Sequence, residues 1–145
     1  MMKTYTGSCH CGEVRFECDI DLAEGTRKCN CSFCYKTRFW KAFAKGETFR
    51  LLQGREFLTD YRGANSLWPE GNVHHYFCSR CGVRPFSRGY LDVEEFGGWF
   101  HCANVACFDN ATDEELATVP VQYEDGRHDN WNSPPAETRY LCVPV

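Results

Sequence analysis

The stretch "CSRCG" (78–82) sets two cysteines three positions apart and places a glycine directly after the second. A second stretch, "CHCG" (9–12), also ends in Cys-Gly. A metal-binding knuckle bends the backbone so that amide N–H groups point at the sulfurs, and glycine tolerates the positive φ of that bend. The two stretches together supply four thiolates, which is the number that closes a tetrahedral structural zinc site. We therefore predict one structural zinc ion, which clips the two segments together, held by Cys9, Cys11, Cys78 and Cys81.

The stretch "CNCSFC" (29–34) differs, because it holds three cysteines and the last is followed by Tyr35 instead of glycine. Three protein ligands and a fourth position open to water or substrate are typical of catalytic zinc. We predict a second, catalytic zinc ion at Cys29, Cys31 and Cys34. The alternative is a closed site with a histidine as fourth ligand, which could be His74, His75 or His101. Seven unconnected buried cysteines and an iron–sulfur cluster are further alternatives, although the spacing does not match the common ferredoxin runs.

Basic residues surround this second group. The segment "RKCNCSFCYKTR" (27–38) contains four basic residues and no acidic one, within a chain of formal net charge −4. Two interpretations stay open. The basic side chains offset the net negative charge of three thiolates on one Zn²⁺, or they attract an anionic thiol.

Length and composition favour one globular domain, residues 1–145, with 43% hydrophobic residues and a net charge that argues against a nucleic-acid partner. The start "MMKTYTGSCHCGEVRFE" has no apolar region typical of a signal peptide. The apolar stretch 97–108 is too short and too polar to span a bilayer. We expect a soluble cytoplasmic protein, and in a reducing compartment clustered cysteines indicate metal binding more often than disulfides.

The pattern along the chain is mostly that of β-strands. Aromatic and β-branched runs separated by glycines predict strands within 13–18, 38–46, 48–54, 55–63, 73–78, 83–90 and 99–108. One helix is expected at 112–119, because Thr112 and Glu115 form a capping box and Pro120 ends it. Cys18, Cys102 and Cys107 fall in strand-like runs and are expected to be small core residues. We predict a mainly β fold of small antiparallel sheets with one short helix.

The ordered combination of "GSCHCGEVRFE", "CNCSFC", "YFCSRCGVRPFSRG", "NVACFD" and "DGRHDNW" resembles the glutathione-dependent formaldehyde-activating enzyme family, whose superfamily includes the centromere protein V-like proteins. The resemblance runs from about residue 5 to about residue 140. It implies an Mss4-like β-tent stabilised by zinc. It also implies a structural zinc at the C-x-C and C-x-x-C-G cysteines and a catalytic zinc at the C-x-C-x-x-C cysteines, which agrees with the assignments above.

The resemblance implies a function as well. We expect a zinc-dependent carbon–sulfur lyase that acts on a thiol–aldehyde adduct like S-hydroxymethylglutathione. The expected partner is a small thiol such as glutathione, with neither nucleic acid nor membrane, and a homodimer stays open. The alternative is a non-catalytic, zinc-stabilised protein-binding module. No general base is identified, since His74 and His75 alternate along a strand and at most one of them can serve. Arg84 and Arg88 either flank a ligand or are exposed strand charges, and the second interpretation is favoured.

Overall fold

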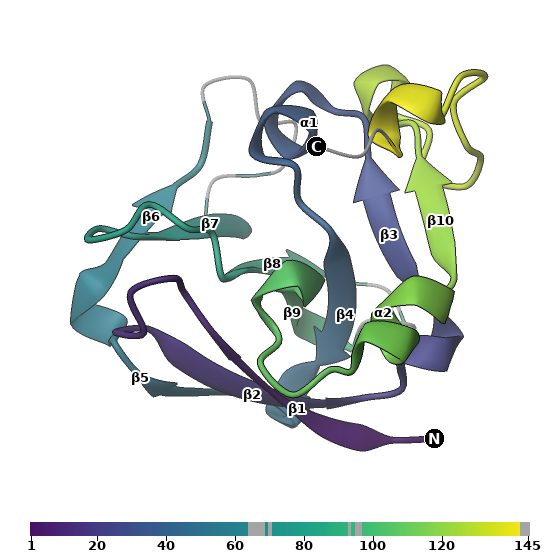
Figure 1. Cartoon of the computed structure of the whole chain (residues 1–145). Helices are drawn as coiled ribbons and strands as arrows, with labels where there is room; N and C mark the ends of the chain where they lie inside the picture. Colours follow the sequence, from purple (N-terminus) through teal and green to yellow (C-terminus); the bar gives the residue numbers. More distant parts are fainter. Residues whose placement is uncertain (64–68, 70, 93, 95–96, 143–145) are drawn as a thin grey trace.

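The computed structural model describes residues 1–63, 69, 71–92, 94 and 97–142 (Figure 1). These residues form ten β-strands and two short α-helices, joined by turns of 3₁₀-helix. The predicted mainly β architecture is therefore confirmed. No helix in the described ranges combines the length and the apolar composition that crossing a membrane requires.

The strands form two sheets. An antiparallel three-stranded sheet has the order β1-β2-β5 and consists of Lys3–Ser8, Arg15–Ile20 and Phe49–Gln53. A seven-stranded sheet has the order β10-β3-β4-β9-β8-β7-β6. Its strands are β3 (Thr26–Cys29), β4 (Lys41–Lys45), β6 (Leu58–Tyr61), β7 (Val73–Cys78), β8 (Phe86–Leu91), β9 (Gly98–Asn104) and β10 (Val121–Glu124).

One strand pair departs from the predicted antiparallel pattern. Strand β10 runs parallel to β3, with Val121 opposite Thr26 and Glu124 opposite Cys29, and Figure 1 shows the two arrows side by side. A parallel pair needs a long connection, and these strands are separated by most of the chain. The pairing brings the C-terminal segment to the end of the strand that leads into the second cysteine group.

The hydrophobic core lies between the two sheets and is rich in aromatic rings. Phe16 of β2 is fully buried, its ring stacks on Phe49 at 5.2 Å between centroids, and Phe49 packs on Phe86 at 4.7 Å. The three cysteines expected in the core are all buried, which confirms that interpretation of Cys18, Cys102 and Cys107.

Two α-helices are present where the sequence predicted one. Helix α2, Asp113–Thr118, has the predicted capping box between Thr112 and Glu115. Helix α1, Ser32–Thr37, was not predicted, because its N-cap is Cys31, whose sulfur accepts from the Cys34 amide in place of a hydroxyl or carboxylate oxygen. The helix ends at Arg38 in a left-handed conformation, with φ of 53°. For this reason the strand expected from residue 38 begins at Lys41.

Candidate metal centres and the adjacent pocket

The four cysteines of the two Cys-Gly stretches lie together. Their sulfur atoms are all within 4.8 Å of one another, and the Sγ of Cys11 lies 3.6 Å from the Sγ atoms of both Cys9 and Cys78. Zinc–sulfur bonds of about 2.3 Å in a tetrahedron place sulfurs about 3.8 Å apart. The fourth member of the set is Cys81. The donor set and its dimensions therefore fit one zinc ion.

The local backbone explains why these sulfurs converge. Gly12 has φ of 82° and Gly82 has φ of 77°, both in the left-handed region that glycine tolerates. Each glycine amide donates to the carbonyl of the first cysteine of its knuckle, at 3.1 Å to Cys9 and 2.8 Å to Cys78. The grouping that the two Cys-Gly stretches predicted is thus present in the fold.

The second group is built from one strand end and one helix start. Cys29 ends β3, Cys31 caps α1 and Cys34 lies in the helix, with all three sulfurs within 4.8 Å of one another. The amide of Cys31 donates to the Cys29 sulfur and the amide of Cys34 to the Cys31 sulfur, both at 3.3 Å. Amide donors favour the thiolate form of a sulfur. Among the residues that the structure describes, no histidine or carboxylate joins this group.

None of the three histidines considered as a fourth ligand belongs to the second group among the described residues. His74 Nδ1 lies 2.6 Å from the Asp60 carboxylate, His75 Nδ1 lies 2.9 Å from an Arg84 nitrogen, and the ring of His101 stacks on Phe49 at 4.2 Å. Burial lowers the pKa of both His75 and His101 to about 4, so both rings are neutral near pH 7. Because a guanidinium can only donate, Nδ1 of His75 accepts and its proton is on Nε2.

The basic residues near the second group have different surroundings. Arg27 and the partly buried Lys41 both pair with Glu124, at 3.0 and 2.8 Å. Lys28 lies over the ring of Trp40 at 5.2 Å, and Arg38 lies over the ring of Tyr35 at 4.6 Å. Two of the four basic side chains that the sequence singled out, those of Lys28 and Arg38, reach a pocket.

This pocket opens directly beside the second cysteine group and has a volume of about 200 Å³. Two sulfurs, two positive charges and an apolar wall line it, contributed by Lys28, Cys29, Cys34, Tyr35, Arg38, Phe39 and Leu141. Leu141 comes from the C-terminal 3₁₀ turn Arg139–Leu141. No pattern in the sequence pointed to Leu141, because its role depends on how the C-terminal segment packs against α1, where the rings of Tyr140 and Tyr35 are in contact.

The interpretation of Arg84 as an exposed strand charge is wrong. Arg84 is 5% exposed, its Nη1 donates to the Thr37 hydroxyl at 3.0 Å, and its guanidinium lies 3.6 Å from the centroid of Phe39. Burial lowers the pKa of Arg84, whereas negative charge on Cys34 acts in the opposite direction. Arg88, by contrast, is partly exposed on β8 and covers Trp99 at 4.0 Å.

A loop from the C-terminal third of the chain packs against the second group. The side chain of Asn30, which is 1% exposed, donates to Asp125 at 2.8 Å and accepts from the Arg127 amide at 2.9 Å. These bonds hold Gly126 so close that an added Cβ would lie 2.5 Å from the Cys29 sulfur and 2.6 Å from the Trp131 ring. Residue 126 therefore has no room for a side chain.

We expect Gly126→Ala to weaken metal binding at the second group, because the new methyl group has to displace either the Cys29 sulfur or the loop. Overpacking of this kind costs about 1–3 kcal/mol of folding stability. Metal titration and denaturant unfolding measure the two effects. Gly71→Ala is the control for metal affinity alone, since a Cβ there meets nothing within 4 Å, whereas its φ of 85° makes any side chain costly for folding. Unchanged metal affinity in Gly126→Ala would show that the loop does not abut Cys29 in solution.

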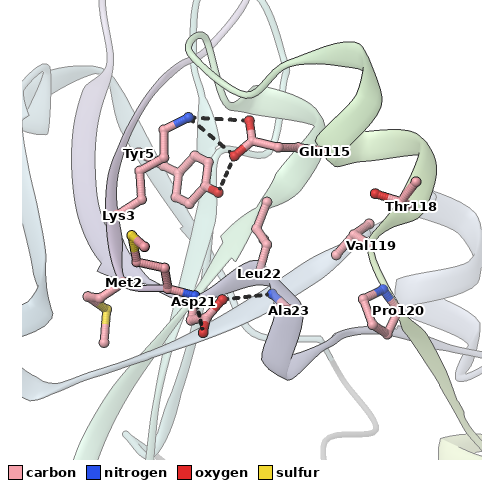
Figure 2. Close-up of a pocket in the computed structure, with 11 residues that line it drawn as sticks. Met2, Lys3, Tyr5, Asp21, Leu22, Ala23, Glu115, Thr118, Val119 and Pro120 are labelled. Atoms are coloured by element: carbon pink, nitrogen blue, oxygen red, sulfur yellow. Dashed lines mark hydrogen bonds and ion pairs between the residues drawn. The ribbon is translucent and has the colours of Figure 1, made fainter.

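A larger cavity, of about 610 Å³, lies between β1 and α2 (Figure 2). Its polar side is a compact network, in which Glu115 accepts from Lys3 at 3.2 Å and from the Tyr5 hydroxyl at 2.8 Å. The backbone amide of Thr112 is the main cause that lowers the pKa of Glu115 to about 2. The described residues that line this cavity include no cysteine. These hydrogen bonds connect Glu115 of the α2 capping box to Lys3 and Tyr5 of β1.

The fold and its two cysteine groups define a class of protein: a small β-rich chain with two candidate metal centres, one closed by four cysteines and one formed by three cysteines beside a basic pocket. The chain matches the family of glutathione-dependent formaldehyde-activating enzymes over residues 4–125, a range that contains both groups. The chain belongs to this family.

One curated protein and one solved structure are similar to this chain. A curated protein of Halomonas elongata whose name places it in the same family is 36% identical over 80 residues, which are 52% of this chain and 50% of that protein. A crystal structure of a Rhodobacter sphaeroides protein superimposes with a TM-score of 0.61 at 27% identity, covering 81% of this chain and 99% of the other.

Proposed function

We propose that the protein is a zinc-dependent carbon–sulfur lyase that forms or cleaves the adduct of formaldehyde with a small anionic thiol such as glutathione. The observation that carries the proposal is the pocket at the second cysteine group. It joins two sulfurs of a three-cysteine site to two cationic side chains, Lys28 and Arg38. The family name supplies the thiol and the aldehyde, which fit this chemistry.

The two cysteine groups have different roles in this proposal. Cys9, Cys11, Cys78 and Cys81 would complete the coordination of a structural zinc ion. Cys29, Cys31 and Cys34 would hold the catalytic zinc and leave one position for a substrate. Zinc bound there supplies a Lewis acid that keeps a thiol in its nucleophilic thiolate form near neutral pH.

The residues of the pocket bind and orient the substrate. Lys28 and Arg38 attract the carboxylates of an anionic thiol and hold its sulfur toward Cys29 and Cys34. Phe39 and Leu141 form the apolar wall that limits access of water to the reacting carbon. Neither His74 nor His75 lines this pocket, so neither is proposed as the base. None of the eleven cysteines, all within the described residues, forms a disulfide, which suits a reducing compartment such as the cytoplasm.

The proposal is tested by metal content and by ligand exchange. We expect about two zinc ions per chain, one of which exchanges readily. With Co²⁺ in both groups, glutathione should change the absorption of the three-cysteine site only. A protein that holds both metals but shows no spectral response to any thiol would have a closed second site. That result would favour the non-catalytic binding module.

Replacing the two basic pocket residues should weaken binding of an anionic thiol. We expect Lys28→Gln and Arg38→Gln each to raise the KM for the glutathione adduct about fivefold, equivalent to about 1 kcal/mol for a solvent-accessible charge pair. Lys36→Gln is the matched control, because Lys36 is exposed on α1 and does not line the pocket. Binding of the neutral thiol 2-mercaptoethanol, followed by Co²⁺ absorption, should not change. An equal loss of binding for both thiols would mean that these residues do not recognise the charge of the substrate.

A further inference from the structure

Arg84 is a buried cation without a carboxylate partner in the described part of the chain. Its side chain forms no ion pair with any described Asp or Glu. Among the described residues its Nε has no hydrogen-bond partner either. A guanidinium that is 5% exposed has lost nearly all of its hydration. Such a charge is costly unless an anion lies next to it.

The surroundings of Arg84 belong to the second cysteine group. Its guanidinium lies between the rings of Phe33 and Phe39, at 4.5 and 3.6 Å from their centroids. Phe33 directly precedes Cys34, and the Phe39 amide donates to the Cys34 carbonyl at 3.1 Å. The Nη1 atom donates to Thr37, whose hydroxyl in turn lies 3.4 Å from the Cys34 carbonyl oxygen. The neutral His75 ring fixes Nη2 at 2.9 Å.

A second cation near these sulfurs, Lys41, differs from Arg84 because it has a carboxylate partner. Lys41 pairs with Glu124 at 2.8 Å, and Glu124 also pairs with Arg27. A divalent metal ion held by three thiolates carries a net charge of −1. This anion is the one counter-charge to Arg84 that the described surroundings supply.

We propose that Arg84 is a positioning residue for the second metal centre: its guanidinium offsets the charge of a metal ion held by three thiolates and orients Cys34 through α1. The inference rests on the proposed function, since it requires a metal at Cys29, Cys31 and Cys34. It also decides between the two interpretations of the basic residues around this group. Arg84, which lies just before β8, offsets the charge of the metal centre. Lys28 and Arg38 are then available to bind the substrate.

The first measurement is the Co²⁺ affinity of the second group in the full-length protein. We expect Arg84→Gln and Arg84→Met to lower it about 10- to 100-fold, as for other residues that support a metal ligand. Arg84→Lys keeps the charge and should recover part of this loss. Arg88→Met is the matched control and should bind Co²⁺ like the parent. The Co²⁺ spectrum of the four-cysteine group reports in every variant that the fold is intact.

The second measurement separates charge from packing. A thiolate as fourth ligand makes the centre more negative, whereas imidazole does not change its charge. Arg84→Gln should therefore weaken thiol binding more than imidazole binding, which a purely structural role would not do. Parent-like Co²⁺ affinity in Arg84→Gln, equal losses in Arg84→Lys and Arg84→Gln, or an unchanged preference between the two ligands would overturn the inference alone. A parent protein that binds no metal at the second group would overturn the proposed function as well.

Discussion

Cys81→Ser should abolish cooperative folding of this protein. Cys81 belongs to the four-sulfur set that joins the β1–β2 hairpin to the turn between β7 and β8. A structural zinc site contributes roughly 10 kcal/mol or more of folding free energy, and a domain of this size has only about 5–15 kcal/mol in total. Serine is a poor zinc ligand, so the variant should lose most of that contribution. Thermal unfolding and metal content are the measurements.

Cys142→Ser is the control for this experiment. Cys142 is exposed and belongs to neither cysteine group. It should keep the parental melting temperature and two metal ions per chain. If Cys81→Ser melts like the parent with its metal content unchanged, the assignment of a structural zinc to this group is wrong.

Cys31→Ser should remove the second metal and the proposed lyase activity without unfolding the protein. Serine at this position can still cap α1, because its hydroxyl can accept from the Cys34 amide as the sulfur does at 3.3 Å. It cannot replace the soft thiolate ligand. The metal content should fall from about two to about one per chain, with little change in the melting temperature.

The contrast with Cys81→Ser makes this prediction sharp, since both variants exchange one sulfur for oxygen. Metal analysis, thermal unfolding and an assay with formaldehyde and glutathione give three independent readings. A Cys31→Ser protein that unfolds like Cys81→Ser would mean that the second group is structural. Retention of both metals together with full activity would mean that Cys31 is not a ligand.

The local features of this chain could be read from its sequence. Gly12 and Gly82 identified the two knuckles, because the positive φ that follows each cysteine depends only on a few neighbouring residues. Thr112 and Glu115 marked the start of α2 for the same reason. The grouping of the seven cysteines into sets of four and three followed from these short-range rules, and the structure places the same residues together.

Other features depend on contacts between segments far apart in the chain, and only the tertiary structure decided them. The interpretation of Arg84 was wrong because its burial depends on the rings of Phe33 in α1 and of Phe39 after it. No pattern around residue 84 reveals these contacts. Leu141 lines the pocket because the C-terminal segment packs against α1 at Tyr35, and Gly126 lies against Cys29 because β10 pairs in parallel with β3. Spacing along the chain reports which residues can bend or cap locally. Burial, charge compensation and the walls of a pocket are set by whichever distant segments the fold brings alongside.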